Sequence, residues 1–153
     1  MDARTRGPAD TDPPGGSDTD ATATYSTVGG GFGNDATARS ATVGGGENNT
    51  AGASGSTVPG GNNNTASGDD SFAAGSNAKA VDEGAFVWAD TTTDDQLAPV
   101  DFSSSSGLGP TGTDTFSVRA TGGVRFATGT SSEGSVSTGV QVGAGSGSWS
   151  SLS

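Results

Sequence analysis

The chain has 153 residues, which fits one domain or a small domain with a tail. Only 29% of the residues are hydrophobic and 28 are glycine, so a monomer has little apolar side chain to offset the entropy lost on folding. A net charge of -11 without any Lys/Arg cluster argues against nucleic acid and anionic membranes as partners. No segment approaches the ~18 apolar residues that would span a membrane. We therefore expect either disorder or a thin core in a repetitive or oligomeric architecture, such as a fibrous trimer.

Two further expectations follow from the composition. An acidic surface that repels itself at low ionic strength is screened in brine, so we predict a halophilic source. The chain has no Cys and no His, which removes disulfides, thiolate metal sites and the commonest general base. The carboxylate pairs at 69–70, 82–83 and 94–95 lie in polar, turn-like contexts. We predict no catalytic site, no enzymatic activity and no cofactor.

Residues 1–23 are rich in Pro, Gly, Asp and Thr and have no periodic apolar position. Such a composition is typical of a flexible linker, or of an attachment segment that becomes ordered on docking to a larger particle.

A repeat occupies the next part of the chain. Residues 25–39, 40–54 and 55–69 align without a gap at a period of 15, and 70–84 is a degenerate fourth copy. A fixed period of this size is typical of a solenoid, in which each repeat buries its apolar face against the next. "S/A-T-V" predicts one strand, the glycine-rich segment a turn with positive φ, and "A-x-A" a second strand. We predict an all-β parallel β-roll over residues 24–90.

The segment "AFVWAD" (85–90) contains the densest hydrophobic patch of the chain. A terminal repeat must cover the last open turn of a solenoid, so this segment is predicted to close the roll. A second interpretation is that Trp88 stacks on a carbohydrate.

Residues 91–115 carry turn signals and are predicted to be a connector. Residues 116–153 are predicted to form a small β-strand region. Its first part alternates apolar and polar residues around Gly122-Gly123, a pattern that favours a β-hairpin, and a weak strand follows near Val136–Val142.

One stretch of the first repeat raises the question of a metal. Residues 30–38 match the calcium-binding nonapeptide G-G-x-G-x-D, with Asp35 as the ligand. In the next two repeats Thr50 and Thr65 replace this Asp, and the period is 15 instead of nine. Asp35 is therefore only a weak calcium candidate, and we predict a turn position there.

The asparagine-rich turns offer another candidate site. Asn48 and Asn63 begin two N-x-T sequons one repeat apart, which makes both residues possible N-glycosylation sites. The alternative is that Asn serves positive-φ turns and stacks into a hydrogen-bonded ladder.

The repeats "ATVGGGENNTAG", "STVPGGNNNTASG" and "SFAAGSNAKAVDEGAFVWAD" resemble the head repeats of trimeric autotransporter adhesins. They are more similar still to related repeats in bacterial and viral tail-fibre-like proteins. "FSVRATGGVRF" (116–126) and "GSWSSLS" (147–153) resemble the segments that follow such repeats. The family continues into an endosialidase-type intramolecular chaperone, which this sequence does not contain, so no catalytic residue is carried over.

The resemblance implies a left-handed β-roll in which three identical chains pack around one axis. It also implies a tail fibre or adhesin, displayed outside a cell or on a virion, that attaches to a cell-surface glycan or protein. A shaft without a receptor and a glycan-degrading tail spike are the alternatives. The residues that we expect at the receptor surface are Asn48, Asn49, Asn63, Asn64 and Trp88.

Overall fold

A computed structural model describes residues 19–91, 102–104, 116–130, 136–143 and 150–152. Every regular element in these ranges is a β-strand, as the sequence predicts, and none of these residues forms a helix that could cross a membrane. The chain divides after Arg119 into two units, a parallel β-roll and a small antiparallel sheet, which are described separately.

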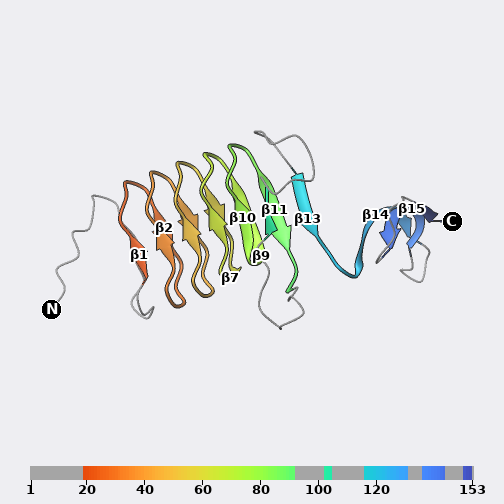
Figure 1. Cartoon of the computed structure of the whole chain (residues 1–153), viewed down its shortest axis with the longest axis horizontal. Coiled ribbons are helices and arrows are strands. Elements are labelled where there is room, and N and C mark those ends of the chain that lie inside the picture. Colours follow the sequence, from red (N-terminus) through yellow and green to blue (C-terminus); the bar gives the residue numbers. More distant parts are fainter. Residues whose placement is uncertain (1–18, 92–101, 105–115, 131–135, 144–149, 153) are drawn as a thin grey trace. The chain divides into compact units, whose positions relative to one another are not determined.

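The roll consists of two parallel sheets, and successive turns of the chain add strands alternately to each (Figure 1). About five turns are stacked, which makes the roll a β-solenoid. Sheet A contains β2 (Thr27–Val28), β4 (Thr42–Val43), β6 (Thr57–Val58), β9 (Phe72–Ser76), β11 (Phe86–Ala89) and β13 (Phe116–Arg119), with β7 (Gly61–Asn62) paired to β9. Sheet B contains β1 (Asp20–Ala21), β3 (Asp35–Ala36), β5 (Thr50–Ala51), β8 (Thr65–Ala66), β10 (Ala78–Ala80) and β12 (Phe102–Ser103).

The register confirms the predicted repeat. In sheet A, Thr27 pairs with Thr42 and Thr42 with Thr57, each one repeat further along the chain. The first strands are only two residues long because a glycine-rich corner follows, where Gly46 and Asn48 have φ values of 92° and 54°. In the first three repeats the second strand is D/T-A, which begins one residue before the predicted A-x-A and ends at its first Ala. In the fourth copy it is A-K-A.

The degenerate fourth copy differs from its neighbours in length. Asn34 and Asn49 are 15 positions apart, whereas the next residue in the same column after Asn64 is Ala78, 14 positions away. Thr57 pairs with Phe72, 15 positions further along the chain, whereas Gly61 pairs with Gly75, only 14 positions further. The fourth copy therefore lacks one residue in the segment between Phe72 and Gly75. As a result β9 runs through the corner as a single strand of five residues.

The roll extends beyond both ends of the predicted block 24–90. β1 pairs with β3, so residues 20–21 belong to the first turn, inside the predicted linker. At the other end β13 pairs with β11 and β12 with β10. The prediction that residues 85–90 close the roll is therefore wrong, because a further strand continues sheet A. Residues 1–18 and most of the predicted connector lie outside the described residues.

The core is a thin stack of small side chains, as the composition predicts. Valines of sheet A and alanines of sheet B face each other inside the roll, and each is at most 2% exposed. Burial of one valine contributes only about 1.5–3 kcal/mol, so hydrogen bonds between the turns must supplement the core. The two columns are Val28, Val43, Val58, Ala73 and Val87, and Ala21, Ala36, Ala51, Ala66 and Ala80.

The second unit is a three-stranded antiparallel sheet of β14 (Gly123–Thr130), β15 (Val136–Gly143) and β16 (Ser150–Leu152). The predicted hairpin around Gly122-Gly123 is wrong. The strand before these glycines is β13, which pairs in parallel with β11, and the strand after them pairs with β15. Alternation identified the strands correctly, but it carries no information about which strand each one pairs with.

Candidate functional site

The aligned asparagines of the repeats form a buried ladder. Asn34, Asn49 and Asn64 are all fully buried. The backbone N and the Nδ2 of Asn49 both donate to Asn34 Oδ1 at 3.0 Å, and Asn64 makes the same two bonds to Asn49 Oδ1. The ladder ends where the backbone N of Ala78 donates to Asn64 Oδ1 at 3.0 Å. The alternative left open by the sequence was a ladder of the sequon residues Asn48 and Asn63, but the observed ladder is formed by the neighbouring column of Asn34, Asn49 and Asn64.

The same side chains also bind the glycine corners. Asn49 Nδ2 lies 3.0 Å from Gly45 O and 2.9 Å from Gly61 O, so one amide joins its own corner to the corner of the next turn. Both Asn49 and Asn64 were expected at the receptor surface. Their burial and hydrogen bonds remove the side chains of these two residues from that surface and give them a structural role.

The two sequon asparagines point outward. Asn48 and Asn63 are exposed and occupy positive-φ positions, with φ of 54° and 55°. Asn48 Nδ2 lies 3.5 Å from Glu47 Oε1, at the limit of a hydrogen bond. Asn48 is therefore the less constrained of the two amides.

The second sequon is held more firmly. Asn63 Nδ2 donates to Asn77 Oδ1 at 2.6 Å. Lys79 Nζ donates to Asn63 O at 3.0 Å and lies 3.2 Å from Thr65 Oγ1, the hydroxyl of the sequon. Glycosylation at either residue stays a prediction, but the local contacts favour Asn48 over Asn63 as an acceptor.

Asp35 lies in strand β3, and not in the turn that the sequence predicts. Its neighbours in sheet B are Asp20 of β1 and Thr50 of β5. The described ranges contain no group of three or more His, Cys, Asp or Glu residues placed to hold a metal ion. A strand position offers fewer oxygens to calcium than a loop does, so this geometry adds no support to the weak calcium candidate.

Trp88 borders an open groove on the roll. The side chain is 38% exposed and lies at the outer surface of β11. The groove has a volume of about 510 Å³ and a mostly apolar surface. Its lining residues are Gly61, Asn62, Gly75, Ser76, Trp88, Ala89, Asp90 and Thr91.

Two of the lining residues, Gly61 and Gly75, contribute backbone and no side chain to the groove. Gly61 and Gly75 are paired in neighbouring strands and have φ values of 105° and 97°. A Cβ on Gly61 would lie 2.1 Å from Gly75 O, and one on Gly75 would lie 1.9 Å from Ala89 O. No other residue fits at either position, so bare backbone lies next to the indole.

An ion pair fixes one end of the groove. Arg119 Nε lies 3.1 Å from Asp90 Oδ1, and both side chains are mostly buried, with exposed fractions of 14% and 20%. Arg119 Nη2 also donates to Asp90 O at 2.8 Å and to Ser76 O at 3.3 Å. The pair joins β13 to the ends of β11 and β9. Sequence reasoning missed it because its two members are separated by a long segment without a repeat.

Sequence reasoning also missed a column of stacked phenylalanines on the outer face of sheet A. The rings of Phe72 and Phe86 lie 4.8 Å apart with an interplanar angle of 5°, and those of Phe86 and Phe116 lie 4.9 Å apart at 16°. Phe116, at the end of the stack, is 66% exposed. The available signal was the alignment of Phe72 with the Thr of the preceding repeats, since the column continues Thr27, Thr42 and Thr57.

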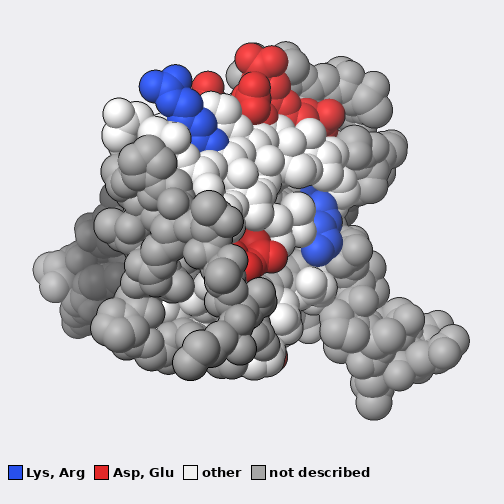
Figure 2. Space-filling view, turned by 90° about the vertical axis from the view of Figure 1, so that its left-hand side faces the viewer, with Lys and Arg blue, Asp and Glu red and all other residues white. Residues whose placement is uncertain are grey.

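The outer columns of the two sheets differ in charge. The column of threonines and phenylalanines on sheet A contains no charged residue. The matching column on sheet B contains Asp20, Asp35 and Lys79. Figure 2 views the roll from its N-terminal side: neutral residues fill most of the described surface, and most acidic side chains in view gather along one edge. Charge is thus unevenly distributed on this acidic chain.

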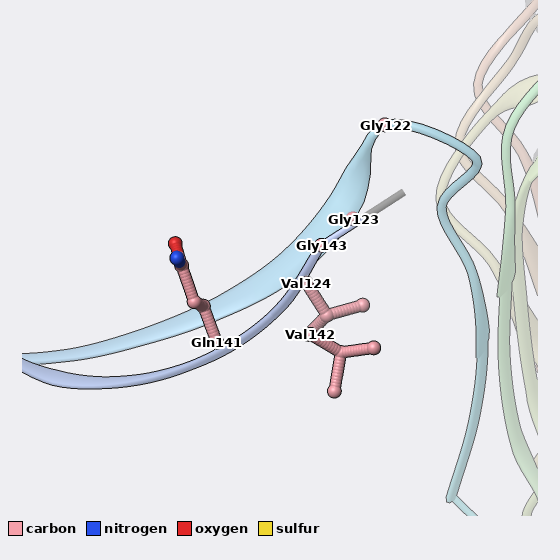
Figure 3. Close-up of a pocket in the computed structure, with 6 residues that line it drawn as sticks. All are labelled: Gly122, Gly123, Val124, Gln141, Val142 and Gly143. Carbon is pink, nitrogen blue, oxygen red and sulfur yellow. The ribbon is translucent and has the colours of Figure 1, made fainter. Parts of the chain in front are cut away.

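The small antiparallel sheet has a shallow pocket of about 250 Å³. Val124 and Val142 point to one side of the paired strands β14 and β15, and Gln141 points to the other side (Figure 3). The remaining lining residues are Gly122, Gly123 and Gly143. None of these six residues can act as an acid, a base or a nucleophile, so this pocket offers no catalytic chemistry.

Comparisons with protein-family models, with curated proteins and with solved structures found no match for this chain. What the structure establishes is a parallel β-solenoid of about five turns with repeats of about 15 residues.

Proposed function

We propose that this chain is a receptor-binding fibre or spike protein, a tail fibre or adhesin, that acts as a homotrimer and attaches to a cell surface. The observation that carries the proposal is the stacked phenylalanine column on the outer face of sheet A. A left-handed coil, a trimer around one axis and a location outside the cell or on a virion belong to the proposal through the resemblance of the repeats.

The phenylalanine column supports self-association for two reasons. Phe72 and Phe86 are half-buried and Phe116 is exposed, so the column leaves apolar surface in water, and such surface marks interaction sites on soluble proteins. The chain carries a net charge of -11, so identical copies repel each other wherever acidic faces meet. The outer column of sheet A is free of charge and can approach another copy without that repulsion. It is therefore the surface of the roll that best fits an identical partner.

The mass of the protein in solution tests this proposal. We expect three times the mass of one chain at high KCl concentration and partial dissociation at low KCl, where acidic chains repel most strongly. Phe116→Thr restores the residue type of the earlier turns. It should weaken the trimer because each copy loses about 1.5–3 kcal/mol of apolar burial, roughly tenfold or more in the association constant.

Phe32→Thr is the matched control. Phe32 is 49% exposed, but it lies in the corner column with Glu47 and not on the outer face of sheet A. This variant should keep the mass of the wild type. A wild-type protein that is monomeric at high salt would contradict the proposal.

A shaft without a receptor is the second candidate function. The burial of Asn49 and Asn64 favours it, because two of the five expected receptor residues serve the scaffold instead. Binding of the labelled protein to whole cells separates the two candidates. We propose no enzymatic activity, and turnover of surface glycans by the purified protein would contradict this part.

A further inference from the structure

We propose that the groove beside Trp88 binds a single neutral pyranose ring of a surface glycan. The inference rests on the proposed attachment role and assigns the receptor contact to one site.

The apolar part of the groove matches one face of a sugar ring. Pyranose rings carry C–H groups on one face, and these weakly positive groups are attracted to the electron-rich face of an indole. The glycine backbone at Gly61 and Gly75 lets a flat ring approach Trp88 without meeting a side chain. The volume of about 510 Å³ falls within the range of small-ligand sites and is sufficient for one ring with part of its neighbour.

The rim of the groove can bind hydroxyl groups. Asn62, Ser76 and Thr91 are among the lining residues, although polar atoms make up little of the groove surface and Ser76 Oγ already accepts from Asn77 Nδ2 at 3.0 Å. Asn62 Nδ2 lies 3.4 Å from Glu47 Oε2, a long contact that a ligand hydroxyl can replace at little cost. Polar groups around an apolar floor are the usual arrangement by which a protein orients a sugar.

Charge selects a neutral sugar. Among the described residues that line the groove, Asp90 is the charged one, and its partner Arg119 is held by Asp90 and by Ser76 O. The guanidinium is thus committed to the protein and does not point a positive charge at a ligand carboxylate or sulfate. The net charge of -11 adds a general repulsion of anionic polysaccharides.

The groove does not suit a quaternary ammonium ligand, although such cations bind aromatic side chains. Their sites are cages of several aromatic rings, whereas Trp88 is the one aromatic residue in the described lining.

The groove and the phenylalanine column are separate parts of one face. Phe86 and Trp88 lie two residues apart on β11, but the described lining of the groove begins at Trp88 and continues toward the corner, and it includes no phenylalanine. A partner copy on the phenylalanines can therefore leave the groove at the rim of the interface.

Titration of the full chain with neutral tetrasaccharides tests the proposal. The panel includes β-linked and α-linked glucose and mannose oligomers, with oligogalacturonate as the anionic probe, and isothermal calorimetry measures binding at low and high KCl. We expect at least one neutral oligomer to bind with an affinity that KCl changes little. Trp88→Ala should lower that affinity at least about tenfold. The affinity of Trp88→Phe should lie between those of the wild type and Trp88→Ala.

Phe32→Ala is the control, because it removes an exposed aromatic side chain outside the groove. It should bind like the wild type. The proposal is overturned if no neutral oligomer binds, if only oligogalacturonate binds, or if Trp88→Ala binds as tightly as the wild type while circular dichroism shows it folded.

Measurements of the mass in solution and of binding to whole cells distinguish a failure of the sugar site from a failure of the proposed function. A trimer that attaches to cells equally well with Trp88→Ala overturns the sugar site and leaves the attachment role standing. A monomer that binds the neutral sugar through Trp88 overturns the trimeric fibre and leaves the sugar site standing.

Discussion

The position just before strands β2, β4, β6, β9 and β11 is buried and is occupied by either serine or alanine. At Ser56 the hydroxyl donates to Ala53 O at 2.6 Å and accepts from Ala53 N at 3.2 Å, which closes the turn. Ser71 is equally buried, but its Oγ has no hydrogen-bond partner. An unpaired buried hydroxyl costs free energy, so equivalent serines in two turns contribute to stability with opposite signs.

We therefore predict that Ser71→Ala stabilises the roll by about 1 kcal/mol. Alanine already occupies the equivalent positions Ala41 and Ala85, so the substitution fits the site. Ser56→Ala should destabilise the roll by about 1 kcal/mol because two hydrogen bonds are lost. Urea unfolding of both variants measures the difference, and a loss of stability in Ser71→Ala would show that its hydroxyl has a partner.

At the scale of elements, the asparagine ladder holds the glycine corners of successive turns together, as the buried valines hold the strands together. Each amide joins one turn to the next through backbone and side-chain hydrogen bonds of about 3 Å. The interior of the roll contains few large side chains, so a large share of the cohesion between turns depends on these buried amides.

Asn49→Ala is predicted to destabilise the roll by about 3 kcal/mol or more, because it leaves the partners on both neighbouring turns unsatisfied. The adjacent residue provides the control. Asn48 is exposed with φ of 54°, so Asn48→Gly should leave the stability unchanged or raise it slightly. Equal losses in the two variants, measured by thermal unfolding, would contradict a special role of the ladder.

The elements also show where sequence reasoning ends. The period, the two strands per repeat and the thin Val/Ala core were predictable, because identical residues recur at identical positions. The inward direction of the Asn49 side chain was not predictable, because the adjacent strand of two residues is too short to show an alternation of apolar and polar residues. The pairing of Phe86 with Phe116 and the Asp90–Arg119 pair also escaped prediction, because the intervening segment carries no repeat. Trp88 was singled out from the sequence, but its groove requires the neighbouring turns.

At the scale of the whole molecule, electrostatic repulsion opposes folding. The chain carries 17 acidic and 6 basic residues, and a compact state brings like charges together. Ions screen this repulsion over about 10 Å at 0.1 M and over shorter distances at higher concentration. Adaptation to high salt, which the composition favours, would follow from the same balance.

We predict that the melting temperature rises with KCl and that most of the rise occurs below about 1 M, where screening of surface charges is nearly complete. Differential scanning calorimetry across a KCl series measures it. Sucrose at matched osmolality is the control, because it strengthens burial without screening charge. A melting temperature that falls with KCl, or that responds equally to sucrose, would contradict an electrostatic origin.

The unbroken register of the central turns makes the roll a scaffold of adjustable length. Residues 40–54 match the turns on both sides position by position, so duplication of this segment in a gene would insert one more turn in frame with both sheets. Each added turn would lengthen the roll by about 4.8 Å, the spacing of neighbouring strands. The groove at Trp88 and the phenylalanine column lie in later turns and would be unaffected. Evolution or protein engineering could thus change the reach of the molecule in fixed steps while its binding surfaces stay the same.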